Sequence, residues 1–331
     1  MNITTNEKLF RSRESQRKQF PIWVERYRPI TLSDVILPND LRRFFNKCVA
    51  DKYVPSLLLY SVSPGCGKSS VAKAICEDIA TDYLYINTSL DNGIDLLRSR
   101  IETFASTVSL SGKCKVVILD EFDGSTRPLQ DALRASIDKF HQTCSFIIIC
   151  NHINKIIKPI RSRCQLIEFS FADQKVREVM SNRFAARIAS ICKAEKVEIV
   201  PELIIKIVST FYPDLRKMIN LIQNFAQQNA NVITEEIVKN TKIDDELLQL
   251  ILNKQISKAR TVIIQNSYDY DSLYRYLFDK FVPAIDKTKR SYAIQKIAEY
   301  MYQSQFVPDP EITFVACLTA LLPTLATTGV A

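Results

Sequence analysis

The sequence predicts an α/β domain with a parallel sheet, followed by two all-helical domains. Up to Phe171, short apolar runs alternate with longer helical stretches, as in a sheet whose parallel strands are joined by helices. After Phe171, the apolar patterns have the 3.6-residue period of a helix, and Pro201, Pro213 and Pro283 interrupt them. The predicted segments are a basic segment (1–20), the α/β domain (21–171), a small helical domain (172–240) and a second helical domain (241–331).

Composition is that of a folded globular protein. The 331 residues are 47% hydrophobic and 24% charged, with only 6 glycines, which excludes a collagen-like or disordered chain. The net charge is +8, and lysines and arginines outnumber acidic residues between residues 8 and 28. A basic balance fits a polyanionic partner and equally fits simple solubility, so charge by itself leaves both interpretations open.

The nine cysteines include no C-x-x-C pair, so we expect reduced, mostly buried thiols and no zinc site. The first residues, MNITTNEKLF, lack the apolar core of a signal peptide, and we expect a cytoplasmic protein. The last twenty residues carry no charge and are long enough to cross a membrane. Because Pro323, Gly329 and five threonines interrupt them, we expect a helix buried against neighbouring subunits and no membrane contact.

Within the α/β domain, the strand candidates are continuously apolar, as strands covered on both faces must be. We expect strands at 56–61, 83–87, 115–119, 145–150 and 165–169, and helices near 68–80, 93–107 and 126–140. In the next domain, Asp173 is a suitable cap for a long helix that runs to about Ala194.

A phosphate-binding loop is predicted where the strand SLLLYS leads into SPGCGKS and a helix. Backbone N–H groups at such a helix start converge on phosphate oxygens, and Gly65 and Gly67 let the backbone come close. Lys68 would pair with the β- and γ-phosphates of ATP, and the Ser69 hydroxyl would coordinate Mg²⁺. Val62 stands where the full motif begins with glycine. The predicted ATP-binding residues of the loop are Gly65, Cys66, Gly67, Lys68, Ser69 and Ser70.

Polar residues at the ends of two later strands complete the predicted site. The strand KVVIL ends in Asp120 and Glu121, at the sheet edge where the phosphate loop is expected. Asp120 would hold Mg²⁺, and Glu121 would polarise the water that attacks the γ-phosphate. Asn151 follows the strand SFIIIC and could contact the γ-phosphate or position that water. A turn asparagine is the alternative for Asn151.

Four further segments narrow the prediction to one family. WVERYRP (23–29), SRC (162–164), PDLRK (213–217) and QDALRASIDKF (130–140) occur in an order and spacing that resemble AAA+ sliding-clamp-loader subunits. The chain is similar to replication factor C small subunits and above all to the T-even-phage-type large subunit, through DEFD and IIKPIRSRC. The resemblance covers roughly residues 20 to 230.

This resemblance implies roles for two arginines outside the phosphate loop. Arg163 of the SRC segment would be a finger that reaches across a subunit boundary to a neighbour's γ-phosphate, where a guanidinium neutralises transition-state charge. Arg216 would contact the nucleotide from the helical lid. The adenine would lie near Val24, Glu25, Arg26, Tyr27 and Ile36.

The resemblance also implies DNA contacts. Arg98 and Arg134 would face a central channel and contact backbone phosphates, which position a duplex without reading its sequence. Solvated helix arginines are the alternative. A residue that restrains Glu121 until DNA binds would lie between Asn87 and Asn92.

The function implied is ATP-driven loading of a ring-shaped polymerase sliding clamp onto primer-template DNA during replication, in a virus if the phage likeness holds. The implied partners are copies of this chain, a second loader subunit, the clamp and the DNA, and the cofactors are ATP and Mg²⁺. Another AAA+ motor, such as a branch-migration helicase or a helicase loader, is the alternative. A scaffold that does not hydrolyse ATP is disfavoured because Lys68, Glu121 and Arg163 are all present.

Overall fold

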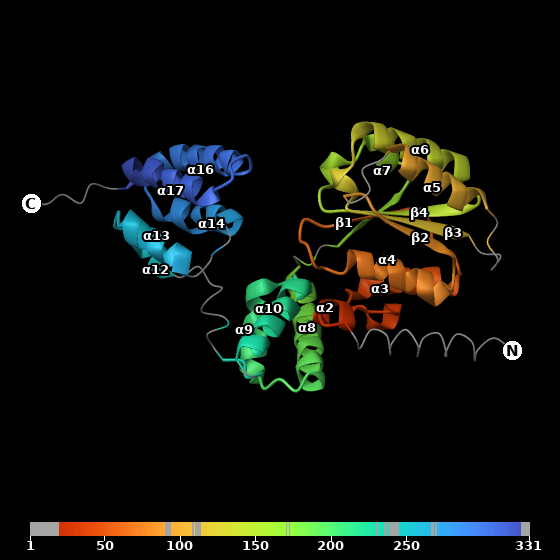
Figure 1. Ribbon diagram of the computed structural model, residues 1–331, viewed down its shortest axis with the longest axis horizontal. Coiled ribbons are helices and arrows are strands. Elements are labelled where there is room, and N and C mark those ends of the chain that lie inside the picture. Colours follow the sequence, from red (N-terminus) through yellow and green to blue (C-terminus); the bar gives the residue numbers. More distant parts are fainter. Residues whose placement is uncertain are drawn as a thin grey trace, which may run out of the picture. The chain divides into compact units, whose positions relative to one another are not determined.

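The computed structural model describes most of the chain between residues 20 and 325 (Figure 1). The residues left out are 1–19, 90–93, 108, 110–113, 170, 172, 230, 235–236, 238–244, 266–267, 269 and 326–331, together with the side chains of 94–96 and 245–246. The predicted basic segment therefore lies outside the described residues, apart from Phe20. The chain forms two compact units, Met1–Ile233 and Thr234–Ala331, which are described separately.

The first unit contains a five-stranded parallel sheet with strand order β2-β3-β4-β1-β5. This confirms the predicted fold class. Strands β3 and β4 are buried along their whole length, because helices cover both faces of the sheet. The strands are β1 (Leu57–Tyr60), β2 (Tyr83–Asn87), β3 (Lys115–Asp120), β4 (Cys144–Cys150) and β5 (Gln165–Glu168).

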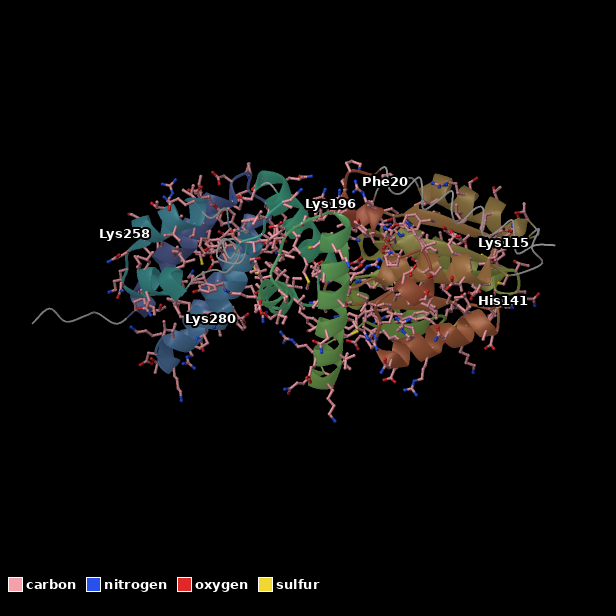
Figure 2. The ribbon with its side chains drawn as sticks, turned by 90° about the horizontal axis from the view of Figure 1, so that it is seen from below. Phe20, Lys115, His141, Lys196, Lys258 and Lys280 are labelled. Carbon is pink, nitrogen blue, oxygen red and sulfur yellow. The ribbon has the colours of Figure 1, made fainter. Side chains whose placement is uncertain are left out.

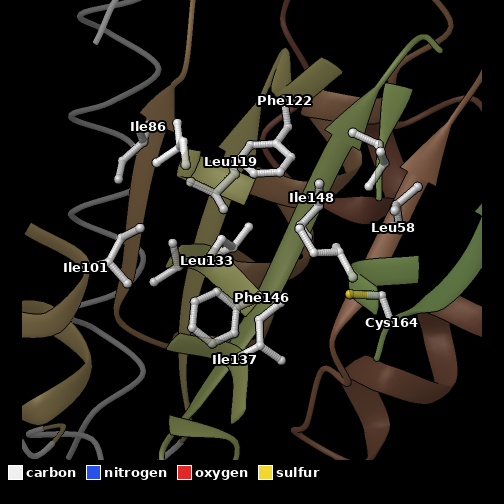
Figure 3. Packing of buried hydrophobic residues seen from close by; sticks show 14 of the residues in the cluster. Leu58, Ile86, Ile101, Leu119, Phe122, Leu133, Ile137, Phe146, Ile148 and Cys164 are labelled. Atoms are coloured by element: carbon white, nitrogen blue, oxygen red, sulfur yellow. The ribbon is translucent and has the colours of Figure 1, made fainter. Parts of the chain in front are cut away.

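Helices α3 (Asn39–Ala50) and α4 (Lys68–Ile79) lie on one face of the sheet, and α5 (Ile94–Ser106), α6 (Arg127–Phe140) and α7 (Lys158–Arg161) lie on the other (Figure 1). The core under α5 and α6 is filled by side chains of alternate strand positions (Figure 3). Its members include Ile86, Leu119, Phe122, Leu133, Phe146 and Ile148.

One buried side chain joins α6 to the segment that leads into α7. The Gln130 Oε1 atom accepts a hydrogen bond from the Ile157 backbone N–H at 2.9 Å. Its Nε2 atom donates to the Lys155 carbonyl at 3.1 Å and to the Ser125 carbonyl at 3.4 Å. With 3% of its surface exposed, Gln130 is a polar junction inside the domain.

Three helices follow the sheet: α8 (Gln174–Ala194), α9 (Pro201–Phe211) and α10 (Leu215–Gln228). Asp173 caps α8 as its position predicts, since its side chain accepts from the backbone N–H groups of Lys175 and Val176. A short helix near the start of the chain, α2 (Trp23–Arg26), packs on α10. There the Gln223 side chain accepts from the Trp23 backbone N–H at 2.8 Å and donates to the Pro21 carbonyl at 2.7 Å. Short 3-10 helices at Leu32–Asp34, Phe122–Gly124 and Ile153–Lys155 complete the first unit.

The elements described in the second unit are all helices, joined by turns and short loops. Its elements are α12 (Asp245–Leu252), α13 (Ile256–Gln265), α14 (Tyr270–Tyr276), the π-helical turn η4 (Leu277–Phe281), α15 (Val282–Ala284), η5 (Lys287–Lys289), α16 (Arg290–Ser304), α17 (Pro310–Leu321) and η6 (Leu322–Thr324). Lys258 and Lys280 lie on its outer surface (Figure 2).

The C-terminal helix α17, which contains the start of the uncharged stretch, differs from expectation in what buries it. Phe314, Cys317, Leu318 and Leu321 of α17 are fully buried in the core of their own unit, so they do not depend on a neighbouring subunit for burial. Among the described helices, none is long and apolar enough to span a membrane. All nine cysteines are free thiols, and all except Cys114 are buried.

Candidate nucleotide-binding site

The loop between β1 and α4 has the backbone that phosphate binding requires. Gly65 and Gly67 have φ angles of +68° and +93°, a left-handed region in which a Cβ atom is strained. Val62, which replaces the first glycine of the motif, is 81% exposed and lies outside that region, so the loop needs no glycine there. Gly67 is the N-cap of α4, so N–H groups of the first helical turn open toward the loop.

Lys68 and Asn151 are brought together at the base of the loop. The Lys68 ammonium is 7% exposed and donates to Asn151 Oδ1 at 2.9 Å and to the Ser63 carbonyl at 3.3 Å. Both acceptors are neutral. The buried positive charge is therefore held next to the pocket without a carboxylate among these partners, and an anionic phosphate would be favoured there.

The acidic end of β3 is held from two sides. Asp120 is 8% exposed; its Oδ1 accepts from the Glu121 backbone N–H at 3.0 Å, and its Oδ2 accepts from the Tyr85 hydroxyl at 2.8 Å. Burial, reinforced by the charge of Asp120, raises the pKa of Tyr85 far above its ordinary value, so this hydroxyl stays a donor.

Glu121 is exposed, and its backbone has a φ of +56°, which is uncommon for a residue with a side chain. The Thr88 hydroxyl lies 3.0 Å from the carbonyl oxygens of both Asp120 and Glu121 and donates to them, which holds this turn. Thr88 falls in the stretch predicted to restrain Glu121. The later part of that stretch, 90–92, lies outside the described residues.

The donor set at this sheet edge fits Mg²⁺. Ser69 and Asp120 line the same pocket and offer a hydroxyl and a carboxylate. A hard cation takes such oxygen ligands, and Mg²⁺ is usually held by one or two protein side chains with substrate phosphates and water completing its shell. A larger protein cage is therefore not needed, and the described residues contain no group of three or more His, Cys, Asp or Glu side chains arranged to hold a metal ion.

Asp123 was missed by sequence reasoning. Its Oδ2 accepts from the backbone N–H groups of Asn151 at 3.3 Å and His152 at 3.1 Å. The last acidic residue of DEFD thus ties the end of β4 to the turn after β3 and sets the position of Asn151. The motif contained the residue, but only the packing of the two strand ends shows its partner.

The residues expected around the adenine do not all lie on the pocket. Val24, Tyr27 and Ile36 line the pocket, whereas Glu25 and Arg26 do not. Arg26 donates to the Glu195 carboxylate at 2.6 Å, and Glu25 accepts from Arg28 at 2.5 Å. The reason is helical geometry, since successive residues of α2 point about 100° apart and a single turn cannot direct all of them at one ligand.

The hydroxyl group of Tyr27 forms its hydrogen bond outside the pocket. Its hydroxyl donates to Glu195 at 2.6 Å, and burial together with this carboxylate raises the pKa of Tyr27 to about 12. Its carbonyl accepts from Arg187 of α8 at 2.9 Å. Arg28 and Pro29 of the YRP segment, which the resemblance places near the adenine, also line the pocket. The remaining lining residues that the sequence did not reveal are Asp34, Val35, Pro64, Ile149, Cys150, Phe184, Arg187, Leu215 and Ile219. Phe184 with Arg187, and Leu215 with Ile219, have the spacing of one helix face.

The loop meets α10 directly. Arg216 lines the pocket, and so do the loop residues expected to bind ATP, which are Gly65, Cys66, Gly67, Lys68, Ser69 and Ser70. A Cβ atom on Gly65 would lie 2.5 Å from Asp214 Cγ and closer still to Oδ1. Asp214 also caps α10 by accepting from the Lys217 backbone N–H at 3.0 Å. The glycine is therefore required by both its backbone angle and this close approach.

Three predicted arginines lie outside the pocket. Arg163 donates from Nε to Asp138 Oδ1 at 2.6 Å and from Nη1 to the Pro159 carbonyl at 2.8 Å, and its guanidinium lowers the pKa of Asp138. Arg134 is exposed on α6, and Arg98 of α5 pairs with Glu102 at 3.3 Å. Helices α5 and α6, which bear Arg98 and Arg134, lie on the same face of the sheet (Figure 1), and Asp138, the partner of Arg163, also belongs to α6.

Two family models match the chain, one over the sheet and one over the helices that follow it. Residues 57–171 match the AAA family, described as ATPases associated with various cellular activities. Residues 176–239 match the lid domain of the sliding-clamp-loader large subunit, an AAA+ ATPase.

Curated relatives carry related names. The sliding-clamp-loader large subunit of Escherichia phage RB69 is 33% identical over 78% of this chain and 83% of its own length. The sliding-clamp-loader large subunit of Enterobacteria phage T4 is also 33% identical, over 74% of this chain and 78% of its own length. The replication factor C small subunit of Methanococcus maripaludis strain S2 is 34% identical over 75% of this chain and 80% of its own length.

Among solved structures, Thermotoga maritima RuvB, a Holliday junction branch migration motor, has a TM-score of 0.52 and 18% identity. The match covers 75% of this chain and 87% of that chain. At this identity the likeness shows a shared fold and no more.

Proposed function

The chain belongs to the family of sliding-clamp-loader subunits within the AAA ATPases, and from this premise we propose that it loads a ring-shaped sliding clamp onto primer-template DNA. It would do so in an assembly with copies of itself and a second loader subunit. ATP would be hydrolysed at the subunit boundaries, with the helical lid closing on the nucleotide and the second unit serving as the collar that joins subunits.

One observation carries the proposal. Lys68, Asp120, Glu121 and Arg216 line one pocket, while Arg163 lies outside it and bonds to Asp138. A subunit with this arrangement holds the groups for binding ATP and activating water but keeps its SRC arginine away from its own phosphates. A finger that acts on a neighbouring subunit would be placed in this way.

The roles of the side chains follow from their surroundings. Loop N–H groups and Lys68 would hold the β- and γ-phosphates, and exchanging Asn151 for phosphate oxygens would give the ammonium an anionic partner. Glu121, exposed at the sheet edge, would orient the attacking water. Asp120 and Ser69 would hold Mg²⁺, which supplies charge neutralisation at the phosphate oxygens when bound.

For DNA, we propose that Arg134 and Arg98 contact backbone phosphates without reading base sequence. Arg134 is exposed, whereas Arg98 would have to exchange its Glu102 partner for a phosphate. Lack of base contacts suits a loader that must accept any primed junction. ATP and DNA would both favour one assembled conformation, and hydrolysis would remove that bias.

The first experiment is steady-state ATP hydrolysis by the chain with its companion subunit. Four conditions are compared: no DNA, blunt duplex, primer-template junction, and junction with the cognate clamp. We expect stimulation by junction and clamp together. Hydrolysis that is indifferent to both, or is stimulated instead by four-way junctions, would contradict clamp loading and favour another AAA+ DNA motor.

Variants then test the roles of single residues. We expect Glu121→Gln and Arg163→Ala to abolish stimulated hydrolysis, the latter by about 10³-fold or more. Arg43→Ala is the matched control, because Arg43 is an exposed arginine that pairs with Asp40 on α3 and does not line the pocket. We expect this control to keep full activity.

Mixing the two inactive variants separates action in trans from action in cis. A Glu121→Gln subunit keeps its finger, and an Arg163→Ala subunit keeps its catalytic carboxylate. With random assembly into head-to-tail contacts, about a quarter of the boundaries between these subunits would combine both intact parts. We therefore expect activity to return on mixing and subunit exchange. No recovery in oligomers shown to exchange subunits would contradict a finger that acts across the boundary.

A further inference from the structure

Tyr85 stands in the middle of β2 and reaches the candidate metal ligand of the neighbouring strand. In the β2–β3 register, Asn87 lies opposite Asp120 and Tyr85 opposite Ile118. Since strand side chains alternate between faces, Tyr85 shares one sheet face with Asp120. Its hydroxyl donates to Asp120 Oδ2 at 2.8 Å. The Lys73 ammonium of α4 lies 3.6 Å from the centre of its ring and helps to hold the ring in place.

The Tyr85 hydrogen bond completes the fixation of Asp120. Oδ1 already accepts from the Glu121 backbone N–H, so both carboxylate oxygens have a protein donor. Each oxygen retains further acceptor capacity. The carboxylate is thus held in one rotamer while remaining able to meet a cation or its water shell.

A second tyrosine on the same strand shows what a purely structural contact looks like. Tyr83 lies two residues earlier on the same face, and its hydroxyl donates to Glu77 Oε1 of α4 at 2.9 Å. Both hydroxyls therefore bond to carboxylates under the same helix. Only the Tyr85 hydroxyl reaches Asp120, one of the two residues that fit Mg²⁺.

We propose that Tyr85 is a positioning residue for the magnesium ion of the nucleotide site, holding the Asp120 carboxylate in the orientation that the cation requires. The inference rests on the proposed function, because that function assigns Asp120 to Mg²⁺. Groups that bond to metal ligands typically change metal affinity about 10–100-fold when removed. Tyr85 is only partly buried, so the lower end of that range applies.

The test measures Mg²⁺ dependence of nucleotide binding and needs no turnover. Full-length wild type, Tyr85→Phe and Tyr83→Phe are titrated with a fluorescent, non-hydrolysable ATP analogue, first in EDTA and then over a range of Mg²⁺ concentrations. We expect Tyr85→Phe to need about tenfold more Mg²⁺ for the half-maximal gain in affinity. Its affinity in EDTA and the whole Tyr83→Phe titration should match wild type. Thermal unfolding confirms that both variants are folded.

The outcomes separate this inference from the proposed function. Wild type that binds nucleotide without any effect of Mg²⁺ overturns both. Wild type with a normal Mg²⁺ effect, but a Tyr85→Phe curve that superimposes on it, overturns the positioning role alone. The positioning role is also overturned if Tyr83→Phe raises the required Mg²⁺ concentration as much as Tyr85→Phe does, because damage to the strand would then explain the result. It is likewise overturned if Tyr85→Phe loses as much nucleotide affinity in EDTA as in Mg²⁺, because damage to the pocket would then explain the result.

Discussion

Gly65→Ala tests the contact between the phosphate loop and the first turn of α10. The substitution places a Cβ atom at a φ of +68°, which costs about 1–2 kcal/mol for a residue other than glycine. The same atom would lie 2.5 Å from Asp214 Cγ, so the Asp214 side chain must rotate away. This rotation breaks the hydrogen bond from the Lys217 N–H to Asp214, and loss of such a helix cap costs about 1 kcal/mol. We expect the free energy of unfolding of the first unit to fall by about 2–3 kcal/mol in total.

A double-mutant cycle isolates the contact from the backbone strain. In an Asp214→Ala background the cap is already absent, so Gly65→Ala should cost only the backbone part, about 1–2 kcal/mol. The coupling between the two sites should therefore be about 1 kcal/mol. Asp173→Ala is the matched control. Asp173 caps α8 in the same way, but it is not among the residues nearest to a Cβ atom on Gly65.

Trp23 gives the signal for this measurement. It is the only tryptophan, is 6% exposed, and its backbone N–H donates to Gln223 of α10. Urea unfolding followed by its fluorescence therefore reports on the unit that contains the loop. The losses of unfolding free energy from Gly65→Ala and Asp173→Ala should add within about 0.3 kcal/mol. If the losses from Gly65→Ala and Asp214→Ala also add within about 0.3 kcal/mol, the loop does not contact the Asp214 carboxylate and the reasoning is refuted.

Three further predictions concern the first unit. Gln130→Leu should lower its free energy of unfolding by about 1–3 kcal/mol, because the buried Ile157 N–H loses its acceptor; an unchanged urea midpoint would show that another acceptor replaces it. Arg163→Ala should leave the urea midpoint of the isolated chain unchanged, because its ion pair with Asp138 is largely exposed, and a clear drop would assign the arginine a structural role. Burial raises the pKa of Cys144 to about 12, so its thiol stays neutral when folded but ionises above about pH 8.5 when unfolded. The stability this thiol contributes is therefore complete below about pH 8.5 and declines as pH rises toward its folded pKa. The urea midpoint should fall from about pH 8 to pH 10, less steeply in Cys144→Ala; identical slopes would contradict the shift.

Local patterns were sufficient for the five strands and for helices α4, α5 and α6 of the α/β domain. Continuous apolar runs identified β1, β3 and β4 because both faces of the sheet are covered there, and the glycines and Lys68 identified the loop because phosphate binding constrains backbone and charge within a few residues. The cap at Asp173 was likewise readable, since it acts on backbone groups two and three residues away. The second unit was predictable only as helical, because helix periodicity does not specify which faces meet.

The adenine end of the site was not readable in the same way. Whether Glu25 and Arg26 face the pocket depends on the orientation of one helical turn, which is set by Glu195 and Gln223, more than 160 residues away. Arg187 reaches the Tyr27 carbonyl across a similar separation, 160 residues. Contacts of this kind produce no recognisable pattern of spacing in the sequence, because they form only when separate elements pack together.

The sequence alone determined the class of the fold, the order of its strands along the chain, and the residue types proposed to bind phosphate and metal. These depend on short-range patterns and on chemistry that few side chains can supply. Only the tertiary structure decided that Tyr85 holds Asp120, that Asp123 holds the end of β4, and that Arg163 rests on Asp138. The physical reason is that a hydrogen bond depends on distances of tenths of an ångström between atoms on different elements, and those distances are set by the packed core beneath them.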